Sequence, residues 1–206
     1  MAELFLSAFV TLFVVIDPLG CAPIYASLAG GAPRPLFRAM AIRACGIALL
    51  ILLGFGLFGE ALLNALHIDL DSFRIAGGIM LFLIAHDMVF EKRTQRREER
   101  AEKLRDSGEA EDVSVFPMAM PMLAGPGSIA TVMLLMTQAP GIESGAAVIG
   151  ALLLVMAISL VALLASGPIM RLLGPRIEAI VTRLLGVLLA ALAVQFVIDG
   201  SRGSFG

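Results

Sequence analysis

Six long apolar stretches set the strongest limit on what this chain of 206 residues can fold into. An α-helix needs about 20 apolar residues to cross the hydrocarbon core of a bilayer, and tilt widens that range by a few residues. The six stretches cover residues 4–28, 40–66, 73–90, 113–138, 146–173 and 180–198. Hydrophobic residues make up 59% of the chain, against about 45–50% in soluble domains. The sequence therefore predicts an all-α membrane protein with six transmembrane helices.

The first apolar stretch contains a carboxylate followed by prolines. Asp17 lies near its middle, directly before Pro18 and six residues before Pro23. Proline removes a backbone donor and crowds the preceding turn, so we expect the first helix to break here, at the membrane midplane. Irregular backbone at that depth persists only where it is buried in protein or lines a wet cavity. The first group of candidate substrate-binding residues is Asp17, Pro18, Leu19, Gly20 and Cys21.

Two roles for Asp17 are open at this stage. An acidic side chain within the membrane is expensive and typically functional, so Asp17 is a candidate contact for a substrate amine or cation, or a proton carrier. An aspartate before a proline is also a common start of a turn or helix, so Asp17 is equally a candidate cap for the helix that resumes at Pro18. The two roles are compatible with each other.

The fourth apolar stretch is interrupted in the same way. Its middle contains the second group of candidate substrate-binding residues: Gly125, Pro126, Gly127 and Ser128. Glycine lets a ligand approach the backbone closely, and a helix that restarts after Pro126 offers free amide groups to an anion such as a carboxylate. The alternative is a seam of small residues that packs against another helix. Interrupted spans at matching places in the two halves of a chain are typical of transporter binding sites, so this pattern favours a binding site over a packing seam.

The two halves of the chain have a related pattern. Pro18 aligns with Pro126 at a spacing of 108 residues, and Gly77 aligns with Gly186 at a spacing of 109. Because each half has three spans, the second half would enter the membrane inverted relative to the first. We divide the chain into a first three-helix repeat (1–90), a charged cytoplasmic linker (91–112) and a second, inverted three-helix repeat (113–206). Residues 200–206 are expected to form a disordered tail.

The distribution of Lys and Arg predicts the orientation. With six spans, both termini share a side with the connections at 67–72 and 139–145, and that side holds only Arg74 and Arg202. The other side holds the remaining 13 of the 15 basic residues. Basic residues accumulate on the cytoplasmic side of membrane proteins, so both termini are expected on the non-cytoplasmic side.

Several function classes lack support in the sequence. No zinc-protease motif, P-loop or nucleophile elbow occurs, and Cys21 and Cys45 fall within apolar stretches as small buried side chains rather than as a disulfide or metal pair. We expect neither an enzyme nor a cofactor. An ion gradient, with H⁺ or Na⁺ as coupling ion, or the gradient of the substrate itself would supply the energy for transport.

The chain resembles the MarC family of integral membrane proteins over nearly its whole length. The resemblance rests on Asp17-Pro18-Leu19-Gly20 with Pro23, and on Phe116-Pro117 through Pro121-Met122-Leu123-Ala124-Gly125-Pro126-Gly127. The family is similar to the lysine-exporter superfamily, and its characterised members are similar to transporters of glycine and alanine. The resemblance therefore implies a secondary transporter, an exporter or exchanger of small neutral amino acids in the inner membrane.

Two alternatives remain at this stage: an exporter of metal cations, and a membrane scaffold without transport activity. A metal exporter predicts clustered carboxylates or histidines in the spans, and only Asp17 lies deep in one. The partners that we expect are an amino acid substrate and membrane lipid, with no nucleic acid. Assembly into a homo-oligomer is left open.

Overall fold

The structure is a computed structural model that describes residues 2–90, 99, 112–139 and 141–205, and these residues form helices and no strands. The helices are α1 (Ala2–Ile16), α2 (Pro18–Ala29), α3 (Arg34–Ala65), α4 (Leu70–Val89), η1 (Ser114–Leu123), α6 (Pro126–Thr137), α7 (Ile142–Leu164) and α8 (Ser166–Phe205). Within the described ranges, five helical segments are long and apolar enough to cross a membrane. A sixth results if η1 and α6, which meet at a bend of 52°, count as one span. The predicted helical membrane class is confirmed.

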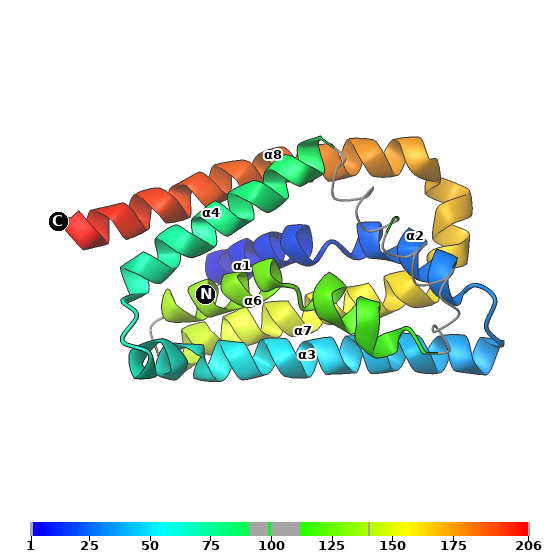
Figure 1. Cartoon of the computed structure of the whole chain (residues 1–206), viewed down its shortest axis with the longest axis horizontal. Coiled ribbons are helices and arrows are strands. Elements are labelled where there is room, and N and C mark those ends of the chain that lie inside the picture. Colours follow the sequence, from blue (N-terminus) through cyan, green and yellow to red (C-terminus); the bar gives the residue numbers. More distant parts are fainter. Residues whose placement is uncertain (1, 91–98, 100–111, 140, 206) are drawn as a thin grey trace.

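The helices lie lengthwise in an elongated bundle (Figure 1). α3 follows one long side, α4 and α8 follow the opposite side, and α1, α6 and α7 lie between them. α1 contacts α6, α7 and α8, so the first helix occupies the centre of the bundle. Both termini lie toward the same end of the molecule as the turn between α3 and α4. The predicted linker at 91–112 falls almost entirely outside the described residues.

Two apolar clusters hold the bundle together. The larger one joins α1, α2, α3, η1, α6 and α7 around side chains such as Leu12, Tyr25 and Leu152. The smaller one joins the end of α1 to α4, α6 and α8 through residues that include Val15 and Leu134. Because α1 contributes to both clusters, the chain around its end at Ile16 is fixed from two sides.

α4 and α8 pack closely because glycines face the partner helix. A Cβ atom built on Gly78 would lie 2.8 Å from the carbonyl oxygen of Ala193 and 2.8 Å from Val197 Cγ2. A Cβ atom on Gly186 would lie 3.2 Å from the carbonyl oxygen of Ala85 and 3.1 Å from Val89 Cγ2. Small residues that let two backbones approach are the usual contact between membrane helices, where apolar burial alone gives little driving force.

The C-terminal tail is helical, which corrects the expectation of disorder. α8 continues to Phe205 because its last turns have a surface to pack on. A Cβ atom on Gly200 would lie 2.7 Å from the carbonyl oxygen of Asp71 at the start of α4. Asp71 also accepts a hydrogen bond of 2.7 Å from Arg74 Nη1. The start of α4 is therefore the surface on which the last turns of α8 pack.

The boundary between the fifth and sixth spans also differs from the prediction. The apolar stretch 146–173 suggested a turn at 174–175, but α7 ends at Leu164 and α8 begins at Ser166. Ala165 separates the two helices, and α8 then curves back alongside α4 (Figure 1). A straight span needs fewer residues than the apolar stretch 146–173 contains. The residues of that stretch after Leu164 therefore belong to α8 rather than to α7.

Candidate functional site

Asp17 forms the junction between α1 and α2. Its backbone is left-handed, with φ 58° and ψ 67°, a conformation that aspartate tolerates better than most residues. Its Oδ1 atom accepts a hydrogen bond of 3.0 Å from the amide of Gly20, and the residue is only 3% exposed. Pro18 occupies the first turn of α2, where a missing N–H group costs nothing. Asp17 is therefore an N-cap, and of its two predicted roles this one is confirmed.

Gly20 makes this cap sterically feasible. A Cβ atom built on Gly20 would lie 2.2 Å from Asp17 Oδ2 and 2.9 Å from Oδ1. Distances below 3.0 Å are closer than any relaxed side chain allows, so a larger residue would displace the carboxylate. A second side chain bonds across the same turn: Cys21 Sγ donates to the carbonyl oxygen of Ile16 over 3.6 Å.

The second interruption lies between η1 and α6. Phe116 and Met120 in η1 have extended backbones, with φ −127° and −130°, because a residue before a proline avoids the helical region. Gly125 is also extended, with φ −77° and ψ 170°, and α6 starts at Pro126. A Cβ atom on Gly125 would lie 2.4 Å from the carbonyl oxygen of Pro121, so the chain is tightly folded back at this point.

The two helix starts differ in how their first turns are capped. At α2 the carboxylate of Asp17 accepts from the Gly20 amide, whereas α6 has no hydrogen bond from a side-chain cap. The first amide groups of a helix have no partner within the helix, and they carry the positive end of its dipole. Gly127 and Ser128 in the first turn of α6 are both buried. The start of α6 is therefore suited to an anion supplied from elsewhere.

The structure brings these two regions close together. A Cβ atom on Gly127 would lie 3.7 Å from Cγ1 of Val15, which is two residues before Asp17. The same atom would lie 2.2 Å from Cδ1 of Ile84 on α4. The end of α1, the start of α6 and the second half of α4 thus meet around Gly127. The sequence did not single out Ile84, because an isoleucine in an apolar span has no feature that separates a site residue from a packing residue.

The nine predicted site residues differ in their burial. Seven are buried: Asp17, Pro18, Gly20, Cys21, Gly125, Gly127 and Ser128. Leu19 is half-buried and Pro126 is exposed. The residues thus belong to two neighbouring helix starts, and Pro126 is the one whose ring faces outward.

Other polar groups lie away from these helix starts. His86 and Asp87 form a pair of 3.6 Å near the end of α4, with the His86 side chain 44% exposed. Arg43 and Asp112 form an exposed ion pair that links α3 to the residues before η1. Hydrogen bonds from Ser114 and the nearby Arg43 guanidinium hold the pKa of Asp112 below its ordinary value. The described part of the chain contains no group of three or more His, Cys, Asp or Glu side chains that could hold a metal ion.

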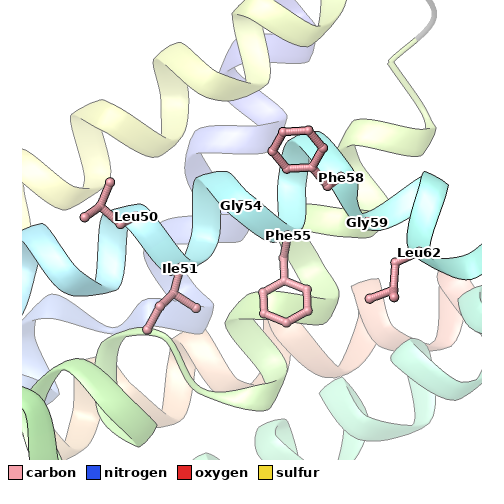
Figure 2. A pocket seen from close by; sticks show the side chains of 7 residues that line it. All are labelled: Leu50, Ile51, Gly54, Phe55, Phe58, Gly59 and Leu62. Atoms are coloured by element: carbon pink, nitrogen blue, oxygen red, sulfur yellow. The ribbon is translucent and has the colours of Figure 1, made fainter.

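An apolar groove lies on the outer face of α3 (Figure 2). It has a volume of about 410 Å³. Its lining residues, all from α3, are Leu50, Ile51, Gly54, Phe55, Phe58, Gly59 and Leu62. Leu50 is 71% exposed and Phe58 is 69% exposed, as expected of side chains that contact lipid tails. The groove offers no polar side chain to a charged ligand.

Comparisons with known proteins cover nearly the entire chain. Residues 2–205 match the model of a family described as "MarC family integral membrane protein". A UPF0056 membrane protein of Methanocaldococcus jannaschii is 36% identical over 202 residues, which is 98% of this chain and 98% of the relative. An inner membrane protein of Escherichia coli K12 is 38% identical over 199 residues, 96% of this chain and 95% of the relative. No solved structure matches the chain.

Proposed function

Since the chain belongs to the MarC family of integral membrane proteins, we propose that it is a secondary transporter of small neutral amino acids such as glycine and alanine. The substrate class follows from the family resemblance. The inner membrane is the proposed location, in agreement with the name of the Escherichia coli relative. The observation that carries the proposal is the uncapped start of α6 beside the capped turn at Asp17.

The proposed site treats the two ends of an amino acid differently. The substrate carboxylate would accept hydrogen bonds from the amides of Gly127 and Ser128, where the dipole of α6 favours a negative charge. The amides around Leu19 are less able to donate to a second anion, because the Asp17 carboxylate already occupies the start of α2. Asp17 would instead attract the substrate ammonium group or a coupling cation. This arrangement gives the two groups of candidate residues different roles, with the carboxylate at the start of α6 and the positive charge at Asp17.

An inverted repeat, with the first and fourth spans broken at the midplane, is part of the proposal. α2 and α6 each have 12 residues. Their first residues are 18 and 126, their last are 29 and 137, and the next helices begin at 34 and 142, so each pair is 108 positions apart. The same spacing relates Gly78 to Gly186, which make equivalent contacts. A spacing of 108 therefore fits the third spans better than the 109 suggested by aligning Gly77 with Gly186.

Contacts between the helices fit the same symmetry. α1 and α2 of the first half pack on α7 of the second, while η1 and α6 of the second half pack on α3 of the first. α4 and α8 pack on each other. A two-fold axis that exchanges the halves would produce this pattern, and it would allow one central site to open to either side of the membrane in turn.

For the orientation, we propose that both termini face the non-cytoplasmic side. The two termini lie toward the same end of the bundle, as six spans require (Figure 1). α3 begins at the opposite end of the bundle (Figure 1), and Arg34, Arg38 and Arg43 in its first three turns fit the cytoplasmic side.

Flux measurements in proteoliposomes test the proposal. We expect the protein to move alanine and glycine, and we expect Asp17→Asn and Gly127→Leu to reduce the flux at least tenfold. Asp17→Asn retains an oxygen that can accept from Gly20, so it removes the charge while preserving the cap. The matched controls are Asp69→Asn on an exposed turn and Gly54→Leu in the lipid-facing groove, both of which should leave flux unchanged.

Two results would overturn the proposal. Unchanged flux in both Asp17→Asn and Gly127→Leu would remove the two helix starts from the mechanism. Thermal stabilisation by divalent metal ions but not by amino acids would instead favour a cation exporter, because a ligand of the folded state raises stability by mass action.

A further inference from the structure

We infer that Ile84 on α4 sets the upper limit on the size of the substrate side chain. The inference rests on the proposed function, because it assumes an amino acid bound at the start of α6. It adds a residue from a third helix to a site otherwise made of the two helix starts.

The geometry around Gly127 supports this assignment. A Cβ atom built on Gly127 would lie 2.2 Å from Ile84 Cδ1 and 3.8 Å from Ile84 Cγ1. The end of the isoleucine therefore lies directly against the backbone of the first turn of α6. Val15 approaches from the α1 side, with Cγ1 3.7 Å from the same position.

Packing holds Ile84 in this position. It is half-buried and packs against the apolar cluster that joins α1, α4, α6 and α8. Gly77, seven residues earlier on α4, lies against α6 as well: a Cβ atom there would be 2.7 Å from Leu134 Cδ1. Because two points of α4 contact α6 so closely, the Ile84 side chain has little room to move away from Gly127.

A substrate carboxylate at the amides of Gly127 and Ser128 brings its own side chain toward this wall. The amide nitrogen and the carboxylate oxygen would be about 2.9 Å apart, and the substrate Cα lies two bonds beyond that oxygen. The first side-chain carbon of the substrate would then emerge among the apolar atoms nearest Gly127, which belong to Ile84 and Val15. Hydrogen or methyl fits beside them, whereas a branched side chain would compete with Ile84 Cδ1 for the same volume.

The selectivity test compares alanine and valine in the full-length protein. Ile84→Ala removes three carbon atoms from the wall, and a pocket that gains one or more methylene groups of space changes discrimination by about 10- to 200-fold. We expect Ile84→Ala to raise the ratio of valine to alanine transport at least tenfold, while Ile84→Val, which removes Cδ1, gives a smaller increase. Ile79→Ala is the matched control, because Ile79 lies on the same helix and is 51% exposed.

A second measurement tests the contact itself, independently of transport. Gly127→Ala should lower the thermal stability of the protein in detergent, and Ile84→Val should restore part of the loss because it removes the atom that the new methyl group would strike. The same Ile84→Val change should not rescue Gly186→Ala, whose neighbours are Met88, Val89 and Ala85.

The outcomes separate this inference from the proposed function. If the wild type transports alanine and Ile84→Ala keeps the same ratio of valine to alanine, the role of Ile84 is refuted and the transport proposal stands. If the wild type neither transports nor binds any amino acid, both the role of Ile84 and the transport proposal are refuted. If Ile79→Ala broadens selectivity as much as Ile84→Ala, the effect comes from a general loosening of α4, and the specific role of Ile84 is refuted.

Discussion

Replacing Gly20 with alanine should destabilise the protein through the Asp17 cap. The added methyl group would lie 2.2 Å from Asp17 Oδ2 and 2.8 Å from Cγ, so the carboxylate would have to move by about 1 Å to reach an ordinary contact distance. That movement would break the hydrogen bond of 3.0 Å between Oδ1 and the Gly20 amide.

The magnitude follows from what the displaced carboxylate loses. Losing an N-cap costs about 1 kcal/mol, and leaving a buried acceptor without its partner costs about 1–3 kcal/mol. The higher helix propensity of alanine offsets at most about 1 kcal/mol of this loss, relative to glycine. We therefore expect Gly20→Ala to lower the free energy of unfolding by about 1–3 kcal/mol.

The assay is reversible unfolding in detergent, with Gly46→Ala as the matched control. Gly46 also lies in a helix, α3, but a Cβ atom there has no neighbour within 4 Å, so alanine should be neutral or slightly stabilising. A double-mutant cycle with Asp17→Ala assigns the mechanism, because Gly20→Ala should cost at least 1 kcal/mol less when no carboxylate is present. Equal stability of Gly20→Ala and Gly46→Ala, or an additive cycle, would refute the steric argument.

Two further predictions concern the repeat and the orientation. Gly78→Ala and Gly186→Ala should each destabilise the protein by about 1–3 kcal/mol, because both force α4 and α8 apart, whereas Gly54→Ala, with open space around it, should not. If only one of Gly78→Ala and Gly186→Ala lowers stability, the two glycines do not make equivalent contacts between α4 and α8. A reporter enzyme that works only outside the cytoplasm should be active when fused to the C-terminus, and one that works only in the cytoplasm should be inactive there. Activity of a cytoplasmic reporter at that position would reverse the proposed orientation.

The helical membrane class and the end of α1 at Asp17 could be predicted from the sequence because both depend on local chemistry. Apolar length decides whether a helix can cross the bilayer. An aspartate followed by a proline stops a helix through its own backbone: α1 ends at Ile16 and α2 begins at Pro18. The resemblance to the MarC family, which rested on these same residues, is confirmed by the match over residues 2–205.

Boundaries that depend on packing were predicted less well. No local feature of residues 200–206 favours a helix, since Gly200 and Gly203 are ordinarily helix breakers. They are compatible with a helix here because they let α8 approach Asp71 at the start of α4. Likewise, apolar character alone could not place the end of α7 at Leu164, because the apolar residues continue well beyond it.

By itself, the sequence determined the membrane class, the family and the positions at which regular helix is interrupted, since each depends on residue type and on neighbours along the chain. Tertiary structure alone decided that the end of α1 lies beside the start of α6, where Val15 Cγ1 is 3.7 Å from a Cβ atom built on Gly127. It also decided that Ile84 lies against Gly127. The two residues are 43 positions apart, and only the packing of α4 on α6 joins them.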